Sequence, residues 1–475
     1  MKQKLNNAMK WSLFTELIVK IISPVTNMIL ARLLNPEAFG IVASLMIITS
    51  FSEMIADAGF QKFLIHYQFK DDNELVEYAS VAFWTNFIIS ILIYFFIFVF
   101  SNSISNLVNL PNYIKAIRVY SLIIILIPLS SINYTMMKKK YEYKSLGLVR
   151  VIFKIIPFCI TIPLSFLGFS YWSLIFGGLI GEFANSFFSF YISKYKIKFF
   201  FSKLHLKKMY KFCLTVSLET FSSWLMSNIS ILIVGYTFGT YMLGIYKVSI
   251  TTVNQIVSIV TAATISIIFT QLSDYQNDNI KFVETILYYQ RKIGFFTIPM
   301  GLLMFLFKDI IVMILLGESW VDANFLIGAW GFVLCESVIF ADIGSIATIA
   351  KGKPINIFYS NLIQVFLLLI FSLFVNKLNF YDAIIVLCII RVQLTVTHFY
   401  FAKQVSNIKI KDVICNIYPY VLSTFIMYIS YNLLNKIVIN KFISIFTLLI
   451  IYIIILLTIP KSRKEIFLFL NFERN

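Results

Sequence analysis

Apolar runs of about twenty residues recur along this chain, and they constrain its fold more than any other feature. The runs do not alternate between apolar and polar residues, so they predict helices rather than the strands of a closed barrel. Backbone polar groups inside a bilayer must be hydrogen-bonded within the protein, and a helix achieves this within one segment. Of 475 residues, 59% are hydrophobic and only 13% are charged, against about 25% in soluble domains. The sequence therefore predicts an all-α polytopic membrane protein.

Turn signals between the apolar runs predict about fourteen transmembrane helices. The first six are expected near 11–34, 37–60, 78–100, 112–136, 148–167 and 170–192. The next six are expected near 211–238, 242–270, 289–316, 322–350, 355–376 and 380–402, and the last two near 413–434 and 439–460. The expected organisation is an N-lobe over 1–192, a basic amphipathic cytoplasmic linker over 193–211, a C-lobe over 212–402, and two helices with a cytoplasmic tail over 403–475.

The distribution of positive charge predicts the orientation in the membrane. If the N-terminus is cytoplasmic, the great majority of Lys and Arg residues outside the helices fall on the cytoplasmic side, as the positive-inside rule requires. Both termini are then cytoplasmic. The net charge of +17 has its explanation in this asymmetry, so it does not indicate a nucleic-acid partner.

The stretch 31–40 separates the first two apolar runs and is predicted to form a tight turn. The residue before a proline avoids the α region, so Asn35-Pro36 ends the first helix. A similar pattern recurs over 235–244, with Gly244 at the place of Gly40. Internal repeats are typical of transporters. Because the predicted orientation puts both turns on the outer face, the two helices that flank each turn are predicted to run parallel to those of the other, not inverted.

Charged side chains within the predicted spans are candidates for function, because each costs about 2.5–3.5 kcal/mol at the bilayer centre. Cations that line a cavity suit an anionic ligand, since desolvated phosphate pairs strongly with Lys and Arg. The candidates for substrate binding are Lys20, Arg32, Lys247 and Arg391. The acidic candidates for ion coupling or charge balance are Glu16, Glu53, Asp57, Glu182, Glu336 and Asp342.

Some of these charges also have structural interpretations. Glu16 and Lys20 are four residues apart, so they can neutralise each other on one helix face. Asp57 lies where the second helix leaves the membrane and can simply end that helix. His398 lies near a predicted helix end, from which its side chain can reach the interface.

No motif for catalysis or for binding a cofactor is present. The sequence lacks a GxxxxGK[ST] phosphate loop, a GxSxG nucleophile motif and an HExxH metal motif. The five cysteines stand singly and the three histidines do not cluster, so neither a metal site nor a disulfide framework is predicted. We therefore expect a protein that is not an enzyme and has no cofactor or metal.

Five short motifs occur in a characteristic order. They are the turn 31–40, Asp57-Ala58-Gly59, the stretch 233–246, Gly317-Glu318-Ser319-Trp320 and Gly352-Lys353-Pro354. In these motifs the chain resembles the Wzx-type polysaccharide flippases of the MOP (MATE-like) superfamily, nearest the colanic-acid-exporter branch. Two features common in that family are absent, an acidic residue at the place of Asn228 and a proline near Thr270. An ion-coupling role for that acid therefore does not transfer to this chain.

The resemblance implies a function and a set of partners. It implies two six-helix lobes in a parallel pseudo-two-fold arrangement, followed by two C-terminal helices. The lobes surround a cavity that opens alternately to each side of the bacterial inner membrane. The implied substrate is an undecaprenyl-diphosphate-linked oligosaccharide, moved from the cytoplasmic to the outer leaflet for O-antigen, capsule or exopolysaccharide synthesis. The implied partners are membrane lipids and, beyond them, a polysaccharide polymerase and assembly proteins. Two alternatives stay open: a MATE-like ion-coupled exporter of small drugs or metabolites, and a non-transporting scaffold for polysaccharide assembly.

Overall fold

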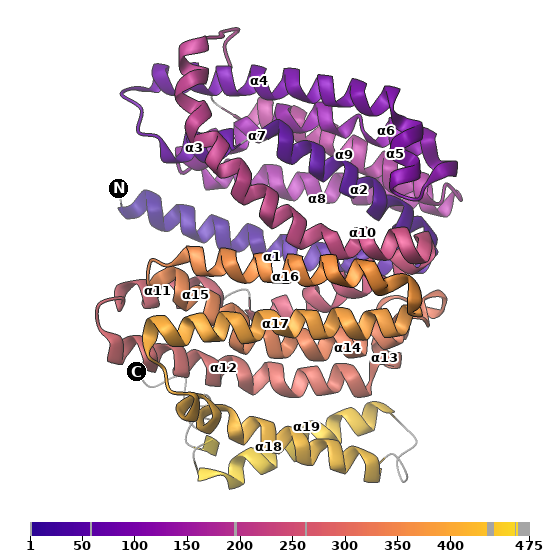
Figure 1. Cartoon of the computed structure of the whole chain (residues 1–475), viewed down its shortest axis with the longest axis vertical. Coiled ribbons are helices and arrows are strands. Elements are labelled where there is room, and N and C mark those ends of the chain that lie inside the picture. The colour runs from indigo at the N-terminus through magenta and orange to yellow at the C-terminus, as the bar shows by residue number, and fades with distance from the viewer. Residues whose placement is uncertain are drawn as a thin grey trace. The chain divides into compact units, whose positions relative to one another are not determined.

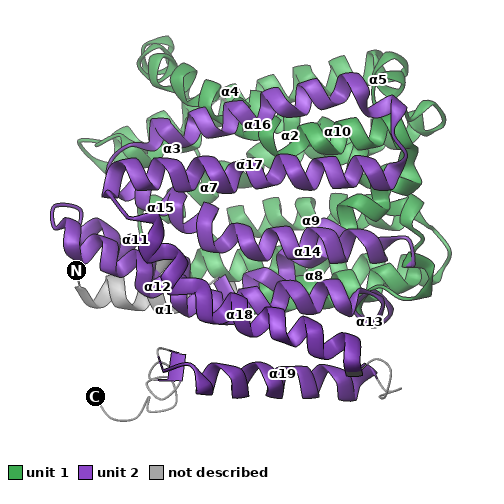
Figure 2. Ribbon diagram, turned by 60° about the horizontal axis from the view of Figure 1, so that its bottom comes forward, with its two compact units in different colours: residues 1–248, 315–320 green, residues 249–314, 321–475 purple. Residues whose placement is uncertain are grey.

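The computed structural model describes residues 2–57, 59–193, 197–261, 264–434, 441–460 and 462–463, which form helices without any strand (Figure 1). The chain divides into two compact units (Figure 2). The first contains residues 1–248 and 315–320, and the second contains residues 249–314 and 321–475. The predicted all-α class is confirmed.

The first unit is built around α8, which packs against α1 and α9, and around α7, which packs against α4 and α9. Its elements are α1 (Lys2–Leu33), α2 (Pro36–Asp57), α3 (Phe60–His66), α4 (Asp72–Val99), α5 (Ser101–Leu107), η1 (Pro111–Tyr113), α6 (Ile114–Tyr120), α7 (Ile123–Lys139), α8 (Tyr143–Phe166), α9 (Tyr171–Ile192), α10 (Lys203–Thr261) as far as residue 248, and η2 (Glu318–Trp320). Apolar side chains of α2, α6 and α9, among them Ile41, Ile117 and Ile175, form one of its buried clusters.

The second unit is built around α12, which packs against α14 and α18, while α18 also packs against α19. Its elements are the end of α10, α11 (Thr264–Asp274), α12 (Asn279–Leu306), α13 (Lys308–Leu315), α14 (Ala323–Ser337), the π-helical η3 (Val338–Asp342), α15 (Ile343–Ala350), α16 (Pro354–Phe374), η4 (Val375–Lys377), α17 (Phe380–Ser406), α18 (Ile410–Leu434) and α19 (Lys441–Thr458). Tyr420 and Met427 of α18 pack with Leu448 and Tyr452 of α19.

The predicted number of spans is confirmed. In the described ranges, eleven helices are long and apolar enough to cross a membrane, and the pair α12–α13, bent by 85°, brings the number to twelve. That number includes α10 once, although α10 contains two of the helices predicted from the sequence. It does not include α1, whose 32 residues correspond to one more predicted helix. The helix expected over 112–136 is interrupted by a turn at residues 121–122, between α6 and α7. The helix expected from residue 211 begins already at Lys203.

The turn at 31–40 forms as predicted. The first helix ends at Leu33 and the second begins at Pro36. The Asn35 side chain accepts a hydrogen bond from the backbone N–H of Ala38 (3.1 Å), which satisfies one of the unpaired donors at the start of α2. The local sequence therefore supplies both the stop of one helix and the cap of the next.

The similar stretch 235–244 packs directly against this turn within the first unit. Gly239 has φ 80° and ψ 179°, a conformation that essentially only glycine adopts, and it breaks α10 into two helical parts. A Cβ atom on Gly40 would lie 1.7 Å from the carbonyl oxygen of Thr240, and one on Gly244 would lie 1.8 Å from that of Pro36. The two glycines therefore let the backbones of α2 and α10 touch, as small residues do at helix crossings in membranes.

The Gly-x-x-Trp motif completes this contact. The indole N–H of Trp320, a fully buried residue, donates to the carbonyl oxygen of Ala31 (2.6 Å). The ring of Trp320 also packs edge-on against Phe39, with ring centroids 5.3 Å apart. Three motifs that are far apart in the sequence thus meet at the α1–α2 turn and fix the position of α2.

Candidate functional site

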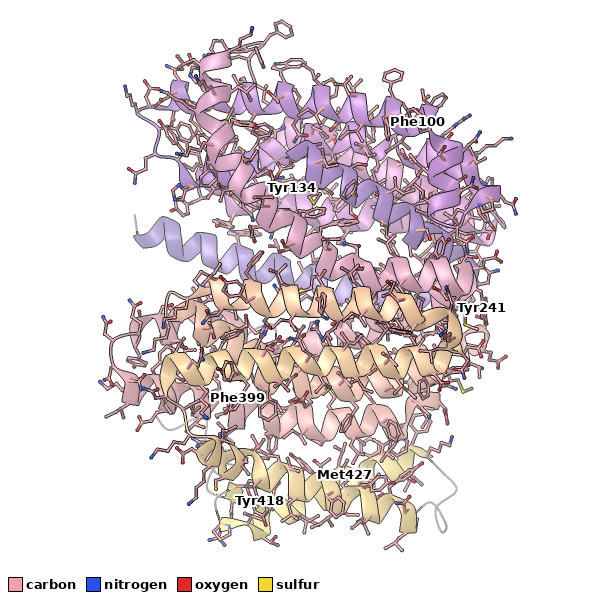
Figure 3. All side chains as sticks on the ribbon, in the orientation of Figure 1. Phe100, Tyr134, Tyr241, Phe399, Tyr418 and Met427 are labelled. Carbon is pink, nitrogen blue, oxygen red and sulfur yellow. The ribbon has the colours of Figure 1, made fainter. Side chains whose placement is uncertain are left out.

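A polar cavity of about 620 Å³ lies within the first unit. Side chains from α2, α3, α6, α7, α8, α9 and α10 line it, and Tyr134 of α7, labelled in Figure 3, is one of them. Five of the lining side chains carry charge: Glu53, Lys138, Arg150, Glu182 and Lys247. Cations therefore outnumber acids around a space of the size that proteins use to bind small ligands.

The buried carboxylate of Glu182 anchors one side of this cavity. Its Oε1 atom accepts hydrogen bonds from the Ser130 hydroxyl (2.9 Å) and from the Asn185 side-chain amide (3.0 Å). The Tyr134 hydroxyl in turn donates to Asn185. Glu182 and Asn185 are three residues apart and so share one face of α9. These hydrogen bonds satisfy a polar group whose burial would otherwise be costly, and they tie α9 to α7.

Two cations, Lys138 and Arg150, lie near each other in the wall of the cavity. Lys138 lies in the last turn of α7 and Arg150 lies in the first half of α8, so the short α7–α8 connection brings them together. They lie within electrostatic range of each other. Within the part of the chain that the structure describes, neither of them forms an ion pair. Their mutual repulsion is relieved when an anion lies between them.

Three of the residues singled out from the sequence line this cavity. Lys247 contributes from α10, Glu53 from α2 and Glu182 from α9. Glu53 lies within electrostatic range of Glu182. Asn228, where the resembled family commonly has an acidic residue, also lines the cavity. Its amide donates to the backbone carbonyl of Trp224 (2.9 Å).

The other candidates of the first unit lie elsewhere. Lys20 is exposed on α1, and Arg32 is exposed in the last turn of that helix, next to Gly317. The side chain of Glu16 lies outside the described residues, and so does Ala58 of the Asp-x-Gly motif. The helix α2 ends at Asp57, whose carboxylate lies within electrostatic range of Lys62 in α3. This geometry agrees with its structural interpretation.

The remaining candidates lie around the π-helical segment η3 of the second unit. Glu336 is the penultimate residue of α14, two positions before this segment, and its carboxylate accepts a hydrogen bond from Thr395 of α17 (3.2 Å). Asp342 ends the segment and lies within electrostatic range of Arg391, which is also on α17. The second unit therefore has a charged cluster of its own.

Side chains of neighbouring helices bond the backbone of η3. The Gln290 amide donates to the carbonyl oxygen of Ile339 (3.4 Å), and the imidazole Nδ1 of His398 lies 3.1 Å from that of Ala341. A π-helical turn leaves the regular α-helical hydrogen-bond pattern, so such side-chain partners stabilise it. His398 is only 8% exposed. The expectation that it reaches the membrane interface is wrong, because this backbone contact holds it in the interior.

Sequence reasoning missed the two approaching cations, since it assigned Lys138 and Arg150 to cytoplasmic segments. A signal for Lys138 was present. Ser130, Tyr134 and Lys138 follow one another at intervals of four residues and all line the cavity, so they form a polar stripe on an otherwise apolar helix. No comparable pattern marks Arg150. Among the described residues, no group of three or more His, Cys, Asp or Glu side chains is placed to hold a metal ion.

A comparison with known protein families shows the family to which the chain belongs. The family model described as "Polysaccharide biosynthesis protein" matches residues 29–324, which is more than half of the sequence. The chain belongs to the polysaccharide biosynthesis protein family. The matched range includes the whole α1–α2 turn and all five charged residues of the cavity.

Several proteins similar to this chain have names that refer to polysaccharide loci, biosynthesis and transport. The chain is 22% identical over 323 residues to an uncharacterized membrane protein in the cps region of Klebsiella pneumoniae, covering 67% of this chain and 66% of that protein. It is 22% identical to the succinoglycan biosynthesis transport protein ExoT of Rhizobium meliloti (strain 1021), covering 66% and 63%. It is 21% identical to the lipopolysaccharide biosynthesis protein WzxC of Escherichia coli (strain K12), covering 67% and 65%. The chain thus spans just under two thirds of these relatives.

Solved structures show the same fold over nearly the whole chain. An inward closed conformation of the lipid II flippase MurJ superposes with a TM-score of 0.77 at 17% identity, covering 96% of this chain and 99% of that chain. An inward-facing multidrug resistance MATE family transporter of the MOP superfamily superposes with a TM-score of 0.64 at 14% identity, covering 82% and 94%. The fold of this polysaccharide biosynthesis protein is therefore that of MOP superfamily transporters.

Proposed function

We propose that this protein is a flippase for undecaprenyl-diphosphate-linked oligosaccharides, which it moves from the cytoplasmic to the outer leaflet by alternating access. The observation that carries this proposal is the approach of Lys138 and Arg150 at a polar cavity, in a chain whose relatives bear names from polysaccharide biosynthesis and transport. A diphosphate is the anionic group that this substrate class shares, whatever its sugars.

The chemistry of the cavity suits such a ligand. A guanidinium presents a planar fork of N–H donors to phosphate oxygens, and an ammonium adds a compact charge, so Arg150 and Lys138 together match two linked phosphates. A diphosphate between them relieves their repulsion. Lys247 supplies a third cation, whereas the uncharged polar groups of the wall, such as Asn185 and Asn228, offer hydrogen bonds to sugar hydroxyls. The net positive lining is less suited to the cationic drugs of the alternative exporter.

The topology of the proposal follows from the charge distribution. We propose an inner-membrane protein with both termini cytoplasmic, which puts the α7–α8 connection, and with it Lys138 and Arg150, on the cytoplasmic side. Substrate then enters with its diphosphate at the cationic side of the cavity. We propose a transport role rather than an enzymatic one, with a polysaccharide polymerase acting on the translocated units.

Charge reversal at the cation pair tests this function. Arg150→Glu and Lys138→Glu are expected to abolish surface glycan in a strain that lacks the wild-type gene, and to cause lipid-linked sugar to accumulate inside the cell. Lys140→Gln is the matched control, because Lys140 belongs to the same basic run but pairs with Asp72 and does not line the cavity. Membrane levels of each variant are measured by immunoblot.

Two results contradict the proposal. The first is normal surface glycan from the Arg150→Glu and Lys138→Glu variants at normal membrane levels. The second is a knockout that leaves glycan unchanged but sensitises cells to small cationic drugs, which supports the MATE-like exporter instead.

A further inference from the structure

A second hollow of the first unit is a groove of about 530 Å³ with an almost entirely apolar lining. Its walls come from α2, α4, α5 and α10. Its two polar side-chain atoms are already hydrogen-bonded: Ser52 Oγ donates to the carbonyl oxygen of Ile48 (2.8 Å), and the indole N–H of Trp224 donates to Ser50 Oγ (3.0 Å). The groove therefore offers contact area to a hydrocarbon ligand. Binding such a ligand leaves neither of these polar side-chain atoms without a hydrogen-bond partner.

The groove and the polar cavity lie on opposite faces of α2. The cavity is lined by residues 46, 49, 50 and 53 of this helix, and the groove by residues 47, 48, 51, 52 and 55. At about 100° per residue these two sets point in opposite directions from the helix axis. A single helix, about 10 Å across, thus separates a site suited to a diphosphate from a site suited to hydrocarbon.

The groove is open along its side and closed at one end. Leu92 and Phe96 of α4 line it and are 63% and 58% exposed, so its side is accessible to lipid. The short helix α5 closes the end near Phe100, which is labelled at the end of α4 in Figure 3. From residue 47 to residue 55 of α2 the groove extends about 12 Å, which is close to the depth of one leaflet of the hydrocarbon core.

Ser50 and Trp224 form the seam between the two sites. Trp224 lines the groove with its ring, which packs against Phe51 with centroids 4.9 Å apart. Its indole nitrogen bonds Ser50, and Ser50 lines the cavity. One turn further along α10, Asn228 lines the cavity as well. The cavity and the groove therefore share one wall, built from α2 and α10, and lie within about one helix diameter of each other.

We propose that the groove binds the isoprenoid chain of the lipid-linked substrate while its diphosphate occupies the cavity. This inference rests on the proposed function and adds a second subsite to it. A cavity of about 150 Å³ holds one benzene molecule, which has six carbon atoms. In proportion, a groove of this volume holds roughly twenty carbon atoms, or about four isoprene units. The covalent link to the diphosphate raises the effective concentration of this chain at the groove, an advantage that a bilayer phospholipid lacks.

Photo-crosslinking in nanodiscs tests the groove. The photoreactive residue p-benzoylphenylalanine replaces Phe51 or Phe96 in the groove, Phe153 in the cavity wall, or Phe366 on α16 as control. Phe366 is 62% exposed and so matches the exposure of Phe96. The probe is radiolabelled undecaprenyl diphosphate at low mole fraction in phosphatidylethanolamine and phosphatidylglycerol. We expect labelling at the groove positions at least about tenfold above that at Phe366, a ratio that needs only modest differential binding, and its loss on addition of unlabelled probe.

The outcomes separate this inference from the function on which it rests. Labelling at Phe153 without labelling above the control at Phe51 and Phe96 overturns the groove but leaves the diphosphate site standing. No labelling at any of the three positions overturns both. In the third outcome, excess phospholipid removes the labelling at the groove as effectively as unlabelled probe does. The groove then holds a membrane lipid, and the assignment to the isoprenoid chain is overturned.

Discussion

Alanine at Gly40 or Gly244 is predicted to force α2 and α10 apart at the α1–α2 turn. The added Cβ atom would lie 1.7 Å from the Thr240 carbonyl oxygen in the first variant and 1.8 Å from the Pro36 carbonyl oxygen in the second. Contacts of a Cβ atom closer than 3.0 Å essentially do not occur, so the backbones must separate by about 1.2 to 1.3 Å in either case. Neither obstacle is a flexible side chain that could rotate away.

The energetic effect follows from this displacement. Overpacking a tight interior contact costs about 1–3 kcal/mol, and here the backbone itself must move, so we expect the upper part of that range. Each single variant already opens the same contact. The double variant Gly40→Ala with Gly244→Ala is therefore expected to cost clearly less than the sum of the two single variants.

The assay is the thermal midpoint of the detergent-purified protein, measured by fluorescence-detected size exclusion. Gly178→Ala is the matched control, because Gly178 is also a helical glycine of the first unit and its added Cβ would make only an ordinary 3.5 Å contact with Tyr120. We expect the midpoint to fall for Gly40→Ala and Gly244→Ala and to stay level or rise for the control. Equal midpoints for all three single variants, or full additivity in the double variant, would refute the backbone contact.

Three further predictions concern single contacts. Trp320→Phe keeps an aromatic ring but loses the hydrogen bond to Ala31, so it is expected to lower stability by roughly 1–2 kcal/mol, and an unchanged thermal midpoint contradicts this. The Lys62 side chain forms an ion pair with Glu219, and both side chains are more than half exposed. Lys62→Ala is therefore expected to change stability by less than about 1 kcal/mol in the same assay. At the start of α12 the backbone N–H of Lys281 donates to Asp278 and lowers the pKa of that carboxyl. The ionised Asp278 carboxylate therefore contributes its full stabilisation above the ordinary pKa of an Asp carboxyl. This stabilisation is lost as the pH falls through the lowered pKa of the folded protein. Protection factors for hydrogen exchange at the start of α12, which are corrected for the intrinsic pH dependence of exchange, are expected to fall over that range in the wild type. Asp278→Ala is expected to show low protection at every pH.

The local sequence was sufficient for the fold class and for the turn that orients the first two helices. Apolar runs of membrane length leave only one economical way to satisfy backbone hydrogen bonds in a bilayer, so the number of helices could be read from the runs. Asn35-Pro36 predicted the turn because its stop and cap signals act over a few residues. The glycine-containing break at 235–244 was visible for the same reason, since Gly239 adopts a conformation closed to other residues.

Only the tertiary structure decided which charges share a cavity. Helical periodicity fixes the face of its own helix on which a residue lies, as the stripe of Ser130, Tyr134 and Lys138 illustrates, but it does not say which helix lies opposite. Arg150 lines the same cavity as this stripe because the short α7–α8 connection turns the chain back on itself. Glu182 lines it too, and accepts hydrogen bonds from Ser130 of α7 and Asn185 of α9. Lys20, by contrast, is as costly a charge in sequence terms, yet it is exposed on α1 and does not line the cavity. The cost of a charge in a membrane depends on what surrounds it, and those surroundings come from residues distant in the sequence.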